Sequence, residues 1–150
     1  MIEVDSYLVG ADGRFVLIGE AVGPPPDPHY IEGAIELTVN GVPILDLDTF
    51  DYVDQLWAYI ADMVRSLQIE GAAGTYLPDQ PVELLFQQQG FGRVLVTRRL
   101  GSISLTALAQ EDELVSALRV GGTAFFKKMI ELVPQNANGY IGALERLNKG

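Results

Sequence analysis

The stretch AIELTVNGVPILDL, residues 34–47, decides the fold class. Apolar residues at positions 35, 37 and 39 alternate with polar ones, which predicts a half-buried strand. Asn40 and Gly41 are the pair that a two-residue type I′ hairpin turn favours, so the chain is expected to return as a second strand from Val42. An antiparallel sheet is therefore the first element of the prediction.

The returning strand is expected to be irregular. A two-residue turn would pair Ile35 with Asp46 and aim this carboxylate at the apolar face, which is costly. The alternation of apolar and polar residues also shifts by one position at Leu45. In addition, Pro43 has no backbone N–H to donate to a neighbouring strand. We therefore expect a β-bulge or an early end to the pairing near Ile44–Leu45. Pro43 further indicates an edge strand or this same irregularity.

The remaining elements follow from the same patterns. An Asp-Gly turn predicts a hairpin of residues 2–8 and 14–22, and three apolar runs at 82–87, 94–96 and 103–107 predict an antiparallel meander. Spacing of 3.6 residues predicts helices that end near Gly71, run over about 110–132, and close the chain over about 139–147. Gly121-Gly122 in the second helix indicates a close approach of another element or a kink.

These elements predict an α+β fold over residues 1–150 as a single domain. We expect one antiparallel sheet of about seven strands, made of two hairpins and then the three-stranded meander. Two long helices and one short C-terminal helix are expected on one face of this sheet. No βαβ alternation, internal repeat or domain linker is visible in the sequence.

The charge is unevenly distributed along the chain. The net charge is −10; residues 1–80 hold 14 acids and 2 bases, whereas residues 81–150 hold 6 acids and 8 bases. An acidic half repels phosphate backbones, so no nucleic-acid partner is expected. It would attract a basic protein and accelerate the encounter, although solubility alone also explains an acidic surface.

The motifs of common catalytic and metal sites are missing. The chain has no cysteine and one histidine, His29, in a proline-rich loop, so thiolate chemistry and the common histidine-based metal sites are not expected. Asp46 and Asp48 begin a calcium-loop spacing, but Phe50 and Trp57 occupy ligand places. Phosphate-binding glycine loops and the G-x-S-x-G elbow are also absent. We predict no catalytic residue, no metal site and no cofactor.

Four aspartates lie within nine residues of the stretch LDLDTFDYVDQLWAYIADMV, residues 45–64. Asp48 or Thr49 is expected to cap the first long helix, with Asp51 in its positive first turn. Asp54 and Asp62 are expected on the solvated face of that helix. A charged binding face is the function that this stretch favours.

The chain resembles the small acidic immunity proteins of bacterial polymorphic-toxin systems. The resemblance lies in the overall pattern, in Asp51-x-x-Asp54-x-x-Trp57, and in the run YLPDQP at residues 76–81. It implies a protein-binding module that binds and blocks a basic toxin, often a nuclease. The partner-binding residues expected on this basis are Asp46, Asp48, Asp51, Asp54, Asp62, Tyr30 and Tyr76.

Two other functional classes stay open. One is a secretion-chaperone-like or other adaptor protein, which would be homodimeric, although such chaperones begin with a helix. The other is an enzyme with an unrecognised carboxylate site. The N-terminus lacks the pattern of a signal peptide and no apolar run reaches 18 residues, so we expect a cytoplasmic protein with no membrane partner.

Overall fold

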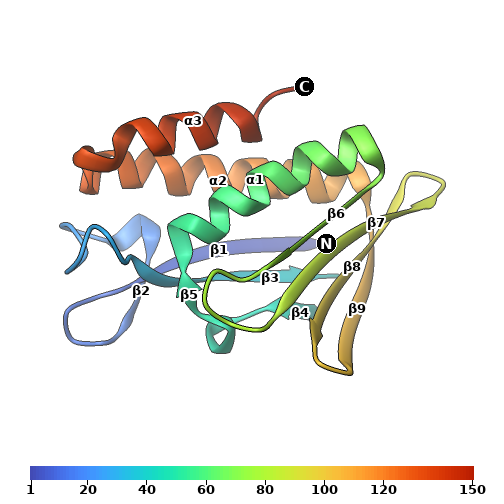
Figure 1. Ribbon diagram of the computed structural model, residues 1–150, viewed down its shortest axis with the longest axis horizontal. Coiled ribbons are helices and arrows are strands. Elements are labelled where there is room, and N and C mark those ends of the chain that lie inside the picture. Colours follow the sequence, from blue (N-terminus) through green and yellow to red (C-terminus); the bar gives the residue numbers. More distant parts are fainter.

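The computed structural model describes residues 1–150 and contains two antiparallel sheets and three α-helices (Figure 1). The first sheet has the order β2-β1-β3-β4, with β5 also paired to β3, and the second has the order β6-β7-β8-β9. Their bounds are β1 Ile2–Val9, β2 Phe15–Leu17, β3 Glu32–Val39, β4 Val42–Leu45, β5 Asp51–Tyr52, β6 Ala72–Tyr76, β7 Glu83–Gly90, β8 Arg93–Leu100 and β9 Ile103–Gln110. The prediction of an α+β fold with antiparallel strands is confirmed.

The prediction of one sheet of about seven strands is wrong. The structure has sheets of five and four strands, and the sequence patterns missed the short strands β5 and β6. No ladder joins β4 to β9, although the two strands are neighbours. Contacts beside these strands link the two sheets instead. The Asn40 amide, in the turn between β3 and β4, donates to the Leu108 carbonyl of β9 at 2.7 Å, and Arg98 of β8 lies 3.6 Å from Asp46, which follows β4.

The expected bulge in β4 is confirmed. Val39 pairs with Val42 and Thr38 with Pro43, but Leu37 pairs with Leu45, so Ile44 is the extra residue. The bulge lets both Ile44 and Leu45 be buried. It also releases Asp46 from the apolar position that regular pairing would have forced on it.

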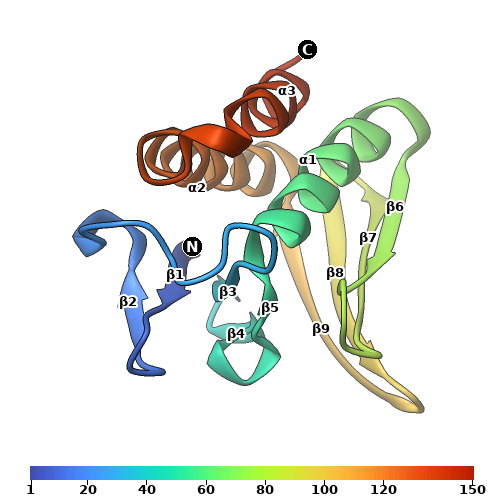
Figure 2. The ribbon, with the colours of Figure 1, turned by 60° about the vertical axis from the view of Figure 1, so that its left-hand side comes forward.

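The helices are α1 (Val53–Glu70), α2 (Glu111–Leu132) and α3 (Ala137–Leu147). Figure 2 shows α1 and α2 over the sheets and α3 on the far side of these two helices. The expectation that all three helices cover one sheet face is therefore wrong: α3 packs on α1 and α2. Its buried side chains, Tyr140, Ala143 and Leu147, fill the groove between these helices.

The start of α1 also differs from the prediction. Asp46 caps a 3₁₀ turn, η2 (Leu47–Thr49), by accepting the backbone N–H groups of Asp48 and Thr49. Asp51 then lies in β5, and α1 begins only at Val53, whose N–H donates to the Ile31 carbonyl. Asp48, Thr49 and Asp51 do not cap α1, because pairing with β3 keeps the chain extended through residue 52.

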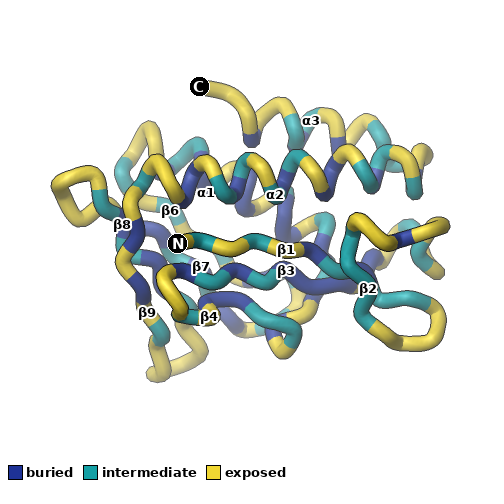
Figure 3. Tube along the Cα trace, turned by 180° about the vertical axis from the view of Figure 1, so that it is seen from behind, coloured by how far each residue is buried: buried dark blue, intermediate teal, exposed yellow.

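The glycine pair in α2 allows a close approach and does not break the helix. A Cβ atom at Gly122 would lie 2.5 Å from Leu147 and 2.9 Å from Trp57, and one at Gly121 would lie 2.7 Å from Val4. Trp57 is fully buried, and its indole N–H donates to the Ser6 hydroxyl at 2.8 Å. The core thus lies between the helices and the inner faces of both sheets (Figure 3).

Candidate functional site

Two neighbouring hollows lie where β5, η2 and the loop between β6 and β7 meet. The first, of about 380 Å³, is lined by Glu32, Phe50, Asp51, Tyr52, Asp79 and Gln80. The second, of about 260 Å³, shares Gln80 and is lined by Asp46, Asp48, Thr49, Val82, Arg98, Leu100, Ile103 and Leu105. We call the residues Glu32, Asp46, Asp48, Phe50, Asp51, Tyr52, Asp79 and Gln80 the acidic end.

A hydrogen bond accepted by the Asp51 carboxylate holds the two walls of the first hollow together. Only 6% of Asp51 is exposed, and its carboxylate accepts the backbone N–H of Tyr52 at 2.7 Å and that of Asp79 at 3.0 Å. The Gln80 amide donates to the Phe50 carbonyl and adds a second link. The loop after β6 is therefore held beside β5, as Figure 1 shows.

Three other carboxylates of the acidic end are free of intramolecular partners. The side chains of Glu32, Asp48 and Asp79 are exposed and make no hydrogen bond or ion pair within the chain. The one cation of the two hollows is Arg98, which already lies 3.6 Å from the Asp46 carboxylate. The two hollows together are thus lined by five carboxylates and one arginine, so the negative charge of the acidic end is largely uncompensated.

Aromatic rings border these carboxylates. Phe50 is 47% exposed and Tyr30 is 59% exposed. The Tyr30 ring lies 5.6 Å from that of Tyr52, and the Phe50 ring lies 6.3 Å from that of Phe15. Exposed aromatic side chains beside carboxylates can hold a cationic side chain by charge and by cation–π contact together.

The carboxylates act electrostatically on Tyr52. Its pKa is raised above the ordinary 10.0, first by burial and then by the negative charges of Asp79 and Glu32. An ionised tyrosine is disfavoured beside these carboxylates, and by the same field a cation is favoured.

The structure brings together four of the seven predicted partner-binding residues. Asp46, Asp48 and Asp51 line the two hollows, and Tyr30 adjoins them through Tyr52. Partner contact at these residues stays a prediction, although burial of Asp51 gives it a structural role as well.

The other three predicted residues lie elsewhere. Asp62 is on α1 and pairs with Arg146 of α3 at 2.9 Å. Tyr76 is 61% exposed at the end of β6, where it pairs with Glu83. Asp54 was expected on the solvated face of α1 but is partly covered, because α3 folds over it and the Tyr140 hydroxyl donates to it at 2.9 Å.

Sequence reasoning missed Glu32, Phe50, Tyr52, Asp79 and Gln80. The run FDY, residues 50–52, was interpreted as a helix start, whereas alternation of two aromatic residues around one acid is typical of an extended strand. Glu32 of β3 pairs with Tyr52 of β5, a residue 20 positions further along the chain. No local pattern predicts that pairing.

A second polar group lies between α1 and α3. The Asn136 amide donates to the Pro28 carbonyl at 2.8 Å, and the Tyr140 hydroxyl donates to Asp54. Burial raises the pKa of Asp54 above the ordinary 3.8, and the pKa of Tyr140 is also raised, chiefly by burial. These contacts connect α1 and α3 to the loop that precedes Tyr30, and they border a hollow of about 350 Å³.

No group of three or more histidine, aspartate or glutamate side chains converges on a place for a metal ion. None of the three helices combines the length and the apolar character that crossing a bilayer requires. No protein-family model, curated protein or solved structure matches this chain.

Proposed function

We propose that this protein binds a basic protein partner at the acidic end. The observation that carries the proposal is that Glu32, Asp48 and Asp79 surround two hollows with no free cation among the lining residues. Exposed carboxylates of this kind destabilise the isolated protein little. They attract a positively charged protein surface and accelerate its association with the acidic end.

The first hollow suits a protruding lysine or arginine side chain. The free Glu32 and Asp79 carboxylates would accept its N–H groups, and the rings of Phe50 and Tyr52 would contact its apolar stem. An arginine in such a place is typical of interface hot spots. The second hollow adds Leu100 and Ile103, which are 49% and 72% exposed and offer apolar contact area beside the charges.

The functional class that agrees with this interface is an immunity protein that binds and blocks a basic toxin. The resemblance noted in the sequence supports the class, and the uncompensated carboxylates support the charge of the partner. Blocking of a nuclease would require only that the acidic end occupies the surface that otherwise binds phosphate. Such a function needs no catalytic residue of its own.

Affinity capture from the native host at low salt tests the proposal. We expect a basic protein to be retained in a stoichiometric amount and to be released as the salt concentration rises, because the contact is electrostatic. Recovery of no stoichiometric partner, or of partners that are neutral or acidic, would contradict the proposal. A toxin encoded directly upstream of this gene would support the immunity class independently.

A further inference from the structure

The turn between β7 and β8 presents a phenylalanine in an unfavourable backbone conformation. Phe91 is 93% exposed and has φ of 53°, between two glycines that also have positive φ. A bulky residue in this region is strained, and asparagine or glycine is the usual choice for such a turn. An exposed, strained aromatic residue at a hairpin tip therefore calls for a functional explanation.

Arg93 accompanies this phenylalanine. Its guanidinium lies 5.6 Å from the centre of the Phe91 ring, and its Nε donates to the Gly90 carbonyl at 3.4 Å. No carboxylate of the chain pairs with Arg93. We call Phe91 and Arg93 the hairpin tip; it combines an apolar ring with an unpaired positive charge.

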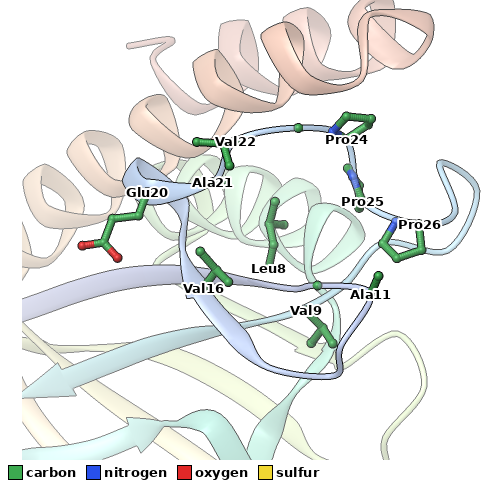
Figure 4. A pocket seen from close by; sticks show the side chains of 12 residues that line it. Leu8, Val9, Ala11, Val16, Glu20, Ala21, Val22, Pro24, Pro25 and Pro26 are labelled. Atoms are coloured by element: carbon green, nitrogen blue, oxygen red, sulfur yellow. The ribbon is translucent and has the colours of Figure 1, made fainter.

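A matching surface lies in the acidic half of the chain. A pocket of about 250 Å³ is enclosed by the β1–β2 hairpin and the segment Pro24-Pro25-Pro26 (Figure 4). Leu8 and Val16, which pair across β1 and β2, form its apolar floor, and Val22, which is 95% exposed, stands at its rim. We call this the proline-loop pocket. Its volume is below the roughly 300 Å³ at which pockets for drug-sized ligands begin, so it suits one side chain.

The pocket also carries the complementary charge. Glu20 is the one charged residue that lines it, and Figure 4 shows its side chain at one margin, pointing away from the other lining side chains. This glutamate makes no ion pair within the chain. An aromatic ring seated on the apolar floor would bring an adjacent arginine to the margin where Glu20 lies.

We propose that the hairpin tip of one copy inserts Phe91 into the proline-loop pocket of a second copy, with Arg93 beside Glu20. The occupant is a second copy because the tip lies in the half of net +2 and the pocket in the half of net −12. Other contacts between two chains of net −10 are opposed by repulsion.

The geometry determines the form of the assembly. The turn between β7 and β8 and the β1–β2 hairpin lie at opposite ends of the long axis in Figure 1. A contact between two different surfaces of the same chain is head-to-tail, so each added copy exposes a new tip and a new pocket. The acidic end contributes no residue to either surface, so the association is independent of the proposed partner.

Sedimentation velocity of two complementary variants tests this contact. Phe91→Asn removes the inserting ring and suits the turn between β7 and β8. Ala11→Trp fills the proline-loop pocket, because Ala11 lines the pocket from an exposed position in the β1–β2 turn. The wild type should show a sedimentation coefficient that rises between about 10 µM and about 1 mM, the range of weak contacts. Each variant alone should stay monomeric. Their mixture should form a 1:1 dimer and nothing larger, since it contains one intact tip and one intact pocket.

Charge exchange provides an independent readout. Glu20→Lys and Arg93→Glu should each weaken the association at least threefold, and the two together should restore it. Val120→Asn is the matched control, because Val120 is 71% exposed on α2 and should leave association unchanged. A wild type that is monomeric at about 1 mM, a Phe91→Asn variant that associates as the wild type does, or a mixture that forms no dimer would each overturn the proposal.

Discussion

The buried carboxylate of Asp51 accepts the backbone N–H of Asp79 at 3.0 Å, across 28 residues of sequence. Because Asp51 lies in β5, this bond connects β5 to the loop between β6 and β7; the same carboxylate also accepts the N–H of its neighbour Tyr52. The shape of the first hollow therefore depends on the Asp51 side chain. Burial of this carboxylate would be too costly without the two hydrogen bonds that it accepts.

Asp51→Ala should destabilise the fold by about 2–4 kcal/mol, because it leaves two backbone N–H groups without their charged acceptor. Asp48→Ala is the control at the same end; its side chain is exposed and makes no bond, so the change should be within about 0.5 kcal/mol. Urea unfolding followed by circular dichroism measures both. Equal stability of the two variants would show that Asp51 does not hold the loop.

The fold class and the bulge could be predicted because both follow from local patterns. Ile35, Leu37 and Val39 determine a strand face, and Asp46 cannot share it, so the bulge at Ile44 was predictable before any contact was known. The division into two sheets was not predictable in this way. It depends on β4 and β9 lying side by side without a ladder, with Asn40 of the β3–β4 turn bonded to Leu108, which no local spacing encodes.

The candidate site was partly predictable for the same reason. The aspartates at 46, 48 and 51 are conspicuous in the sequence, and the structure does place them at one end. Glu32 and Asp79 join them through strand pairing and loop packing over long sequence separations. Asp54 lies outside the site: it is on α1, where Tyr140 of α3, the last helix in the sequence, covers it.

Gly122→Ala should be destabilising although alanine is the better helix former. A Cβ atom there would lie 2.5 Å from Leu147 and 2.9 Å from Trp57, both fully buried, and overpacking of this kind costs about 1–3 kcal/mol. Gly139→Ala in α3 is the matched control. It has nothing within 4 Å and should be stabilising by about 0.5–1 kcal/mol. Thermal unfolding distinguishes the two, and equal shifts of Tm would argue against the close approach of α2.

Asp54 should give the stability a dependence on pH in the acidic range. Burial raises its pKa in the folded chain above 3.8, while the hydrogen bond from Tyr140 opposes this shift. The folded state then binds a proton at higher pH than the unfolded state, so this contribution to stability falls as the pH rises through that window. At neutral pH, where Asp54 is ionised in both the folded and the unfolded state, burial of its charge still lowers the free energy of unfolding.

Asp54→Asn removes the titrating group and retains an oxygen that accepts from Tyr140. The difference in unfolding free energy between wild type and variant should change between pH 3.8 and the folded pKa and be constant above it. Urea unfolding over a pH series measures this difference. Parallel curves across the acidic range would mean that the pKa of Asp54 is not raised by the fold.

Phe91→Asn should stabilise the isolated chain. It relieves a left-handed conformation that costs a bulky residue about 1–2 kcal/mol, and it loses a cation–π contact worth about 0.5–1 kcal/mol. Phe91→Ala is the comparison, because alanine loses the same contact and keeps the strain. We expect the stability order Asn above Phe above Ala in urea unfolding. An asparagine variant less stable than the alanine variant would contradict the assigned turn geometry.

The central claim is that the acidic end binds a basic partner through its own carboxylates and not through the net charge of the chain. Glu32→Gln, Asp48→Asn and Asp79→Asn combined remove three charges and no intramolecular bond. Asp112→Asn, Glu131→Gln and Glu145→Gln combined remove three exposed charges on α2 and α3 and serve as the control of equal net charge.

Affinity capture from the host with wild type and both triple variants at one low salt concentration is the most direct measurement. The same basic protein should be retained by the wild type and by the control variant, and its recovery should fall at least tenfold with the variant of the acidic end. Equal recovery of the basic protein with all three chains, or equal loss from both variants, would contradict a binding site at the acidic end.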